Sequence, residues 1–268
     1  MKQVLKYPGA KTRLAPWICS FIPDHKVYLE PFFGSGAVFF NKQPCRIETI
    51  NDLNDDVYNY FKVLRDCPDE LIRLIELTAY GRTEYEASWG SVDDFSRAQV
   101  VSNIERARRF AVHCWMAIGC GNLYHNGFRS GQSSTSPSPA HTWDTLPDVM
   151  RVAAKRLKQV QIEHLKALEI ISRYNTLDVF IYADPPYLRS TRKSNLYKHE
   201  MTDQDHVDML TALKRHPGKV LISGYDNDLY NQTLKGWRKE TKSTLAEGGV
   251  KRKEVLWMNY DPDVRLDL

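Results

Sequence analysis

The sequence predicts an α/β fold in which a mostly parallel sheet carries helices on both faces. Short apolar segments with β-favouring residues alternate along the chain with segments whose apolar residues recur at helical spacing. Three predicted strands also end in residues that a buried strand does not need, at 30–34 (EPFFG), 51–52 (ND) and 184–187 (DPPY). The carboxyl ends of parallel strands share one edge of a sheet, which is where ligands bind in such folds.

Each element is predicted from a local pattern. A strand is expected where β-branched and aromatic residues form a short apolar run, and a helix where apolar residues recur every three or four positions. Thr202, followed by Asp205, resembles the capping box that begins a helix. In chain order, we expect a strand, glycine turn and helix start at 26–40, a strand and helix at 46–66, helices at 69–79 and 93–119, a strand at 158–165, a helix at 167–174, a strand at 178–183, a helix at 201–216, a strand at 218–225, and paired strands at 237–245 and 253–260.

Composition narrows the class of protein. The 268 residues are 42% hydrophobic and 26% charged, which is ordinary for a globular protein, and the net charge of +4 suits a polyanionic partner. No run of eighteen apolar residues indicates a membrane span, and the N-terminal segment lacks the apolar region of a secretory signal. The five cysteines are odd in number and form no CxxC pair. We therefore expect a reduced, cytoplasmic protein without a metal site.

The middle of the chain has a different character. The predicted helix at 93–119 carries a basic patch at Arg106, Arg108 and Arg109. The segment 120–147 that follows is rich in Gly, Ser, Pro and Asn. A connection of that length is typical of a functional loop or a disordered one.

The first two unusual strand ends have two interpretations each. Gly34 and Gly36 let the backbone approach a ligand closely, or simply make a tight turn from strand to helix. They do not fit the GxGxxG or P-loop patterns. Asp52 can accept hydrogen bonds from both hydroxyls of a ribose, or it can cap the helix that follows.

The third strand end, Asp184–Pro185–Pro186–Tyr187, is the most informative. The two prolines fix the backbone and remove two N–H donors, so the Asp184 carboxylate and the Pro185 carbonyl form a pair of acceptors. Such a pair suits an amino group that carries two hydrogens, and Tyr187 offers a ring face on which a planar base can stack. A turn with a capping Asp is the plainer interpretation, but it needs only one of the four residues.

Four segments in this order resemble the DNA adenine N6-methyltransferases of the Dam type, the D12 class. They are YPGAKTRL (7–14), EPFFGSGAVFF (30–40), INDLN (50–54) and ADPPYL (183–188). The resemblance spans nearly the whole chain. It implies a Rossmann-like fold of S-adenosylmethionine-dependent methyltransferases, with a catalytic domain over 1–66 and 148–268 and a helical and loop insert for target recognition over 67–147.

The resemblance also implies a role for each matching residue. Asp184 and Pro185 would accept hydrogen bonds from the target amino group, Pro186 belongs to the same catalytic tetrapeptide, and Tyr187 would stack on the flipped base. Lys11 would meet the methionine carboxylate of the cofactor. The residues implied to bind S-adenosylmethionine are Tyr7, Gly9, Lys11, Glu30, Pro31, Phe32, Phe33, Gly34, Gly36, Asp52, His164, Leu165 and Asp184.

One segment departs from the pattern of the family. Many relatives have an acid or an amide just before the catalytic strand, where the adenine of the cofactor is read. This chain has His164 and Lys166 there. Backbone groups or His164 can take over that contact, and His164 also fits a helix cap or a surface position.

The implied partner is double-stranded DNA, in which an adenine is flipped out and methylated at N6, with no metal because the leaving thioether is neutral. We expect a monomer or a weak dimer. Gly127 and Gly131 bracket Arg129 and would present it at a loop tip, although a solvated loop is the alternative. The residues expected to contact DNA are Asn122, Tyr124, Asn126, Arg129, Arg192, Lys193 and Tyr197.

Other functions remain open from the sequence. Methyltransferases that act on adenine in RNA, on protein amides or on cytosine N4 use related tetrapeptides, although cytosine enzymes more often carry Ser in place of Asp184. A nucleic-acid-binding module with a decayed methylase fold belongs to a different class, and the intact Lys11, Gly34, Asp52 and Asp184 argue against it.

Overall fold

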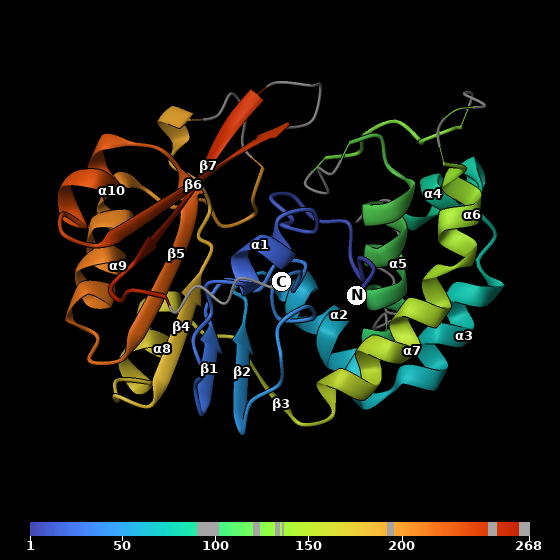
Figure 1. The fold of residues 1–268 in the computed structure, drawn as a ribbon. Coiled ribbons are helices and arrows are strands. Elements are labelled where there is room, and N and C mark those ends of the chain that lie inside the picture. The colour runs from blue at the N-terminus through green and yellow to red at the C-terminus, as the bar shows by residue number, and fades with distance from the viewer. Residues whose placement is uncertain are drawn as a thin grey trace.

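A computed structural model describes residues 1–89, 102–119, 124–131, 135, 137–191, 196–245 and 251–262. Its centre is a seven-stranded sheet with the order β3–β2–β1–β4–β5–β7–β6 (Figure 1). Strands β1 to β5 run parallel, whereas β7 lies antiparallel between β5 and β6. The predicted mostly parallel α/β fold is therefore confirmed. The strands are β1 (Val27–Glu30), β2 (Ile47–Asn51), β3 (Val160–Glu163), β4 (Val179–Ala183), β5 (Lys219–Tyr225), β6 (Arg238–Leu245) and β7 (Lys251–Met258).

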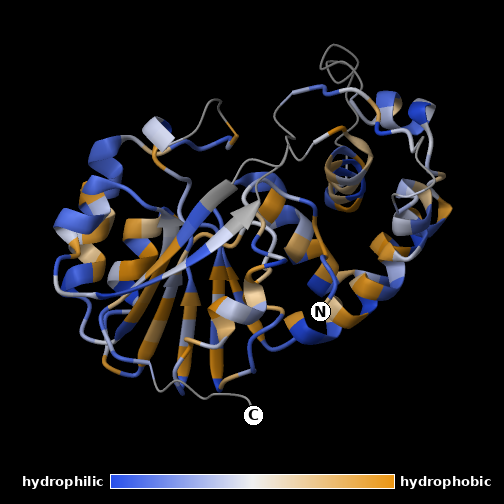
Figure 2. Cartoon of the chain, turned by 45° about the horizontal axis from the view of Figure 1, so that its top comes forward, coloured by the Kyte–Doolittle hydropathy of each residue, from blue (hydrophilic) through white to orange (hydrophobic). Residues whose placement is uncertain are grey.

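Apolar side chains of the strands divide into two cores, because successive residues of a strand point to opposite faces. Phe180 and Tyr182 of β4 join the core that holds α2, α5 and α7, whereas Val179 and Ile181 join the core that holds α8 and α9. Figure 2 shows the apolar residues gathered along the central strands. The helices are α1 (Ala15–Cys19), α2 (Asp55–Asp66), α3 (Pro68–Leu77), α4 (Arg82–Ser88), α5 (Asn103–Met116), α6 (Pro139–Asp144), α7 (Leu146–Leu157), α8 (Ala167–Arg173), α9 (Asp203–Arg215), α10 (Asp228–Thr233) and the short 3₁₀ helix η2 (Arg189–Thr191).

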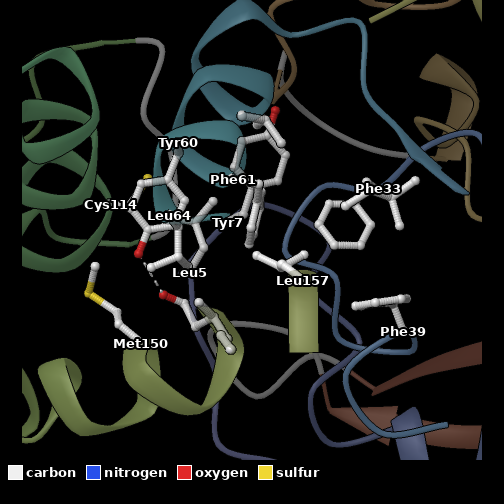
Figure 3. Close-up of a cluster of buried hydrophobic side chains, with 14 of the residues drawn as sticks. Leu5, Tyr7, Phe33, Phe39, Tyr60, Phe61, Leu64, Cys114, Met150 and Leu157 are labelled. Carbon is white, nitrogen blue, oxygen red and sulfur yellow. Dashed lines mark hydrogen bonds between the residues drawn. The ribbon is translucent and has the colours of Figure 1, made fainter. Parts of the chain in front are cut away.

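The chain between β2 and β3 forms a group of helices beside the sheet. Helix α2 contacts α3, α5 and α7, and α3 also contacts α5 and α7. Figure 3 shows Tyr60 and Leu64 of α2 close to Cys114 of α5 and Met150 of α7. The strands at either end of this long excursion are neighbours in the sheet, since Thr49 pairs with a residue 112 positions later. The predicted domain boundary between residues 147 and 148 falls inside α7.

Some expected elements differ from the observed ones. No α-helix follows the glycine turn: residues 34–35 and 37–41 form turns, and Gly34 and Gly36 have φ of 50° and 67°, outside the helical region. The helix expected at 93–119 is α5, which begins after the capping residue Ser102, while 90–101 lie outside the described residues. The loop expected at 120–147 contains α6. The helices that were not expected from the sequence are α1, α4, α7 and α10.

The predicted basic patch of α5 is neutralised by neighbouring acids. Arg106 lies 3.4 Å from Asp56, and Arg108 and Arg109 lie 2.7 Å and 2.9 Å from the same oxygen of Glu105. These pairs connect α5 to the start of α2 and offset part of the positive charge, while the side chain of Arg106 stays 43% exposed. Within the described residues, no helix is long and apolar enough to cross a membrane.

Candidate functional site

The carboxyl ends of β1, β2 and β4 surround one cavity of about 240 Å³. In the sheet, β1 lies between β2 and β4, so the chain leaves β1 on one side and returns on the other. A crevice opens at such a reversal of strand order. The predicted site residues that line the cavity are Tyr7, Gly9, Lys11, Glu30, Pro31, Phe32, Phe33, Gly34, Asp52, Asp184, Pro186 and Tyr197.

A single buried amide, Asn51, ties three strand ends together. Its Nδ2 donates to the carbonyl oxygens of Pro31 at 2.9 Å and Leu165 at 3.0 Å, and its Oδ1 accepts from the N–H of Leu165 at 2.8 Å. These partners follow β1 and β3, while Asn51 ends β2. Because every polar atom of the amide is bonded, the edge of the sheet that forms the cavity is fixed.

The Asp52 carboxylate lies between the glycine turn and the entry to α2. Its Oδ2 accepts from the N–H of Gly34 at 2.7 Å, and its Oδ1 accepts from the N–H of Asn54 at 2.9 Å. Asn54, rather than Asp52, is the N-cap of α2. Burial raises the pKa of Asp52, and the two N–H donors oppose that rise. Each oxygen accepts one N–H in this way and keeps further acceptor capacity for a ligand in the cavity.

The two glycines of the turn have different roles. Gly34 lines the cavity and donates its N–H to Asp52. Gly36 does not line the cavity, and a Cβ at this position would collide with the rings of Phe33 and Phe40. Gly36 therefore serves the aromatic packing beneath the cavity rather than the cavity itself.

Aromatic and acidic side chains form the wall near β1. Phe33 lines the cavity and packs at 4.7 Å, between ring centroids, against Phe61 (Figure 3), whereas Phe32 lines it from the opposite core. Glu30 is buried and accepts from the hydroxyl of Tyr28 at 2.7 Å. Burial raises the pKa of Glu30 well above its usual range.

Tyr7 and Tyr197 form another part of the wall. The hydroxyl of Tyr7 accepts from Nδ2 of Asn54 at 3.1 Å, and its ring lies 6.5 Å from that of Tyr197. Gly9 has φ of 73°, and a Cβ there would collide with the hydroxyl of Tyr197. Tyr197 was expected among the DNA contacts, but it lies in the cavity against this glycine.

Asp184 is held at both of its oxygens. Its Oδ1 accepts from the hydroxyl of Ser223 at 2.8 Å, and its Oδ2 lies 2.8 Å from Nζ of Lys11. Ser223 is also 2.9 Å from the hydroxyl of Tyr182. An ionised carboxylate can only accept, so the Ser223 proton points to Asp184 and Tyr182 donates to Ser223. This chain fixes the orientation of the carboxylate at the cavity wall.

Lys11 lies between two acids. Its Nζ is 2.8 Å from Asp184 and 3.7 Å from Oε1 of Glu254, donates to the carbonyl of Gly9 at 3.0 Å, and stands 4.6 Å from the ring centroid of Tyr187. Burial opposes the charge of this ammonium, but Asp184 and Glu254 outweigh that effect and raise the pKa of Lys11. Lys11 thus stays charged, and its carboxylate partners in the structure are those of the protein.

Tyr187 is buried behind the cavity wall. Its hydroxyl donates to Oε1 of Glu254 at 2.6 Å, and its ring centroid lies 4.4 Å from that of Tyr225. Pro186 lines the cavity, whereas Pro185 and Tyr187 do not. The sequence analysis did not identify Glu254. The available signal was a single acid at the start of the apolar run of β7.

The segment before α8 contributes backbone groups to the site, and the side chain of His164 lies outside the cavity. The ring of His164 stacks on Tyr58 at 4.7 Å, and its Nε2 lies 3.1 Å from the carbonyl of Leu53, outside the cavity. This agrees with the surface interpretation of His164. Leu165 acts through its backbone contacts with Asn51. Residues 166–168 at the start of α8 form the cavity wall instead.

The segment expected to read DNA is attached to α5. The N–H of Ile118 donates to the carbonyl of Gly127 at 2.8 Å, and the N–H of Arg129 donates to that of Met116 at 2.7 Å. The hydroxyl of Tyr80 also donates to the carbonyl of Arg129 at 2.6 Å. The expectation that Arg129 occupies a loop tip is therefore wrong, because it lies on an arm that returns along the end of α5.

The remaining expected DNA contacts are only partly described. The side chains of Tyr124 and Arg129 are exposed, and the carbonyl of Asn126 accepts from the hydroxyl of Tyr85. Asn122, Arg192 and Lys193 lie outside the described residues. Among the residues that the structure describes, no group of three or more His, Cys, Asp or Glu side chains could hold a metal ion.

Comparisons with known proteins place the chain in a family. A family model described as D12 class N6 adenine-specific DNA methyltransferase matches residues 7–247. A type II methyltransferase of Methanocaldococcus jannaschii is 27% identical over 97% of this chain and 99% of its own. A type II methyltransferase of Lactococcus lactis is 25% identical over 97% and 96%. A DNA N-6-adenine-methyltransferase of Escherichia phage P1 is 27% identical over 89% of this chain and 32% of its own.

Proposed function

Because this chain belongs to the D12 class of N6 adenine-specific DNA methyltransferases, we propose that its cavity binds S-adenosylmethionine together with an adenine flipped out of duplex DNA. One observation carries the proposal. Asp184, held by Lys11 and Ser223, shares the cavity with the Gly34–Asp52 pair. An acceptor for an amine and an acceptor for a ribose therefore lie in one enclosed space.

The polar and apolar groups that line the cavity suit S-adenosylmethionine. Asp52 has acceptor capacity for the two ribose hydroxyls, and the apolar side chains of Ala167 and Leu168 offer a surface for the adenine ring. Glu30 and Phe32 lie at the end of β1, where a charged methionine tail and a sulfonium can be accommodated. Lys11, Gly9 and the other cavity residues named from the sequence belong to the same proposal.

The chain's own residues prepare the target amine. S-adenosylmethionine supplies a methyl group on a sulfonium, so the departing group is a neutral thioether. The exocyclic amine of adenine is a weak nucleophile, because its lone pair is delocalised into the ring. Asp184 and the Pro185 carbonyl accept its two hydrogens, which favours a pyramidal nitrogen with its lone pair toward the methyl group. Positioning of this kind accounts for much of the rate of such reactions.

Access of the base requires the adenine to leave the duplex, at a cost of a few kcal/mol. The family resemblance proposes Tyr187 as the residue that stacks on the flipped base, and its ring, which lies behind the cavity wall in the structure, is held there through Glu254. Residues 124–131 and the helices that hold them are the proposed target-recognition region. The proposed catalytic domain is 1–66 with 148–268, and the proposed insert is 67–147.

Methyl transfer from labelled S-adenosylmethionine to duplex DNA, with detection of N6-methyladenine, tests this function. We expect the wild-type chain to methylate adenine in duplex DNA, and Asp184→Ala to abolish turnover while cofactor affinity stays within a few-fold. The reason is that Asp184 faces the target amine rather than the ribose end of the cavity. Equal rates in the variant would refute its catalytic role. Label in RNA or at cytosine N4 would support the alternative substrates, and binding without turnover would support the decayed module.

A further inference from the structure

Glu254 of β7 stands behind the cavity wall and contacts two proposed functional residues at once. It is 3% exposed and does not line the cavity. Its Oε1 accepts from the Tyr187 hydroxyl at 2.6 Å and lies 3.7 Å from the Lys11 ammonium. A single carboxylate oxygen therefore links a member of the tetrapeptide to the cation that holds Asp184.

The charges of this group are unequal. Two carboxylates, the half-buried Asp184 and the buried Glu254, share the single ammonium of Lys11. An ammonium that faces one carboxylate alone withdraws that carboxylate from other hydrogen-bond donors. With Glu254 beside it, Lys11 is divided between two acids, and Asp184 retains more capacity to accept from an amine in the cavity.

We infer that Glu254 is a positioning residue for methyl transfer, which acts on Asp184 through Lys11 and on the proposed base-stacking ring through the Tyr187 hydroxyl. The inference rests on the proposed function of the cavity. It concerns turnover rather than cofactor binding, because Glu254 touches neither the cavity nor the ribose-binding Asp52.

A second buried acid provides a matched comparison. Glu48 of β2 is also 3% exposed, and it pairs with Lys42 and Arg156 on a part of the sheet that does not line the cavity. Burial alone would raise the pKa of Glu48, but the hydrogen bonds from Arg156 and Lys42 outweigh burial and lower it. For Glu254, burial prevails and the pKa is raised despite Lys11. Glu48 is thus paired with two cations, whereas Glu254 shares one cation with Asp184.

The experiment compares Glu254→Gln with Glu48→Gln in the full chain. The glutamine at 254 keeps an acceptor for Tyr187 and removes only the charge. We expect its turnover at saturating S-adenosylmethionine and duplex DNA to fall at least tenfold, with cofactor affinity within threefold and a melting temperature equal to or above that of wild type. Glu48→Gln should show the opposite pattern. Its melting temperature should fall, while its turnover should equal that of wild type at temperatures well below the melting temperature of the variant.

Two further variants separate the parts of the inference. Glu254→Asp retains the charge and should recover part of the turnover that Glu254→Gln loses. Tyr187→Phe keeps the charge and removes the hydrogen bond, so it isolates the effect on the ring. Turnover of Glu254→Gln within twofold of wild type would overturn the inference, and so would parallel losses of turnover, cofactor affinity and melting temperature. Absence of methyl transfer by wild type would overturn the proposed function as well.

Discussion

At the scale of single residues, the site separates groups that hold one another from groups that face the cavity. Asp52 does both, since it accepts N–H bonds from Gly34 and Asn54 and also lines the cavity. A residue used only as a helix cap would accept from the first turn of α2, as Asn54 does. The geometry of Asp52 therefore fits the ribose role better than the capping role.

Asp52→Ala should weaken S-adenosylmethionine binding by about 1.5–3 kcal/mol, because hydrogen bonds to a charged acceptor are the stronger ones. Isothermal titration calorimetry measures this directly. Asp55→Ala is the control, since Asp55 is exposed at the start of the same helix and does not line the cavity. Unchanged affinity in Asp52→Ala would return Asp52 to a structural role.

The sequence predicts some of these residues better than others. Asp184, Asp52 and Gly34 stand in short runs of unusual residues at strand ends, so their place at the cavity follows from local order and parallel strands. Ser223 is a single polar residue within an apolar strand, and Glu254 follows three basic residues at the start of β7. Their contacts depend on how β4, β5 and β7 pair, and no local pattern contains that register.

At the scale of elements, the strands and several helices were predictable, whereas α7 was missed although it has twelve residues. The five parallel strands and helices α2, α3, α8 and α9 lie close to their predicted positions. Helices α4, α6 and α10 have only six or seven residues, which offers few turns from which to recognise a period, although α8 is as short and was predicted. The helix expected after the glycine turn fails for a different reason, because two residues with positive φ precede it.

The returning arm that carries Arg129 leads to a prediction about DNA. Its backbone is bonded to the end of α5, while its side chain is exposed. Since the arm is not the tip of the loop, we expect Arg129 to contact a phosphate. Arg129→Ala should then weaken DNA binding on all sequences alike and lower the salt slope by about one unit, with cofactor affinity unchanged.

Binding isotherms on a set of site variants at two salt concentrations measure this effect. Arg173→Ala is the control, because Arg173 is an exposed arginine of α8 that pairs with Glu169. A loss of about 1–3 kcal/mol confined to one preferred site would instead indicate a contact with a guanine edge. Wild-type binding in Arg129→Ala would exclude the arm from DNA contact.

At the scale of the whole molecule, buried and half-buried acids differ in the direction of their pKa shifts. At the cavity, burial raises the pKa of Glu30 and Asp52. Away from it, arginine and lysine partners outweigh burial and lower the pKa of Glu48 and Glu105. Folding therefore favours the ionised form of the outer acids and disfavours the ionised form of the acids at the cavity.

This division gives opposite responses to pH. A carboxyl whose pKa is raised by folding holds its proton more tightly in the folded state than in the unfolded state. Its contribution to the free energy of unfolding is therefore lost as the pH rises from the unfolded pKa of 4.5 through the folded pKa. Glu30→Gln should thus raise the melting temperature at pH 8 and change it much less near pH 4. Glu105→Gln should lower it at pH 8, because a carboxyl with a lowered pKa stabilises the fold above that range. Thermal unfolding of both variants at the two pH values tests this, and a destabilised Glu30→Gln at pH 8 would contradict it.

The long excursion between β2 and β3 also has a consequence during synthesis of the chain. Thr49 of β2 pairs with a residue 112 positions later in the chain. At a synthesis rate of 5–20 residues per second, one edge of β2 therefore stays unpaired for roughly 6–22 s after the strand leaves the ribosome. An open strand edge invites pairing with other chains. Glu48 lies on this strand and has two ion partners, Lys42 and Arg156. Lys42 is synthesised before β2, whereas Arg156 is synthesised only just before β3. Charged side chains on an open strand discourage pairing with other chains, and Glu48 supplies such a charge on β2 before β3 has been synthesised.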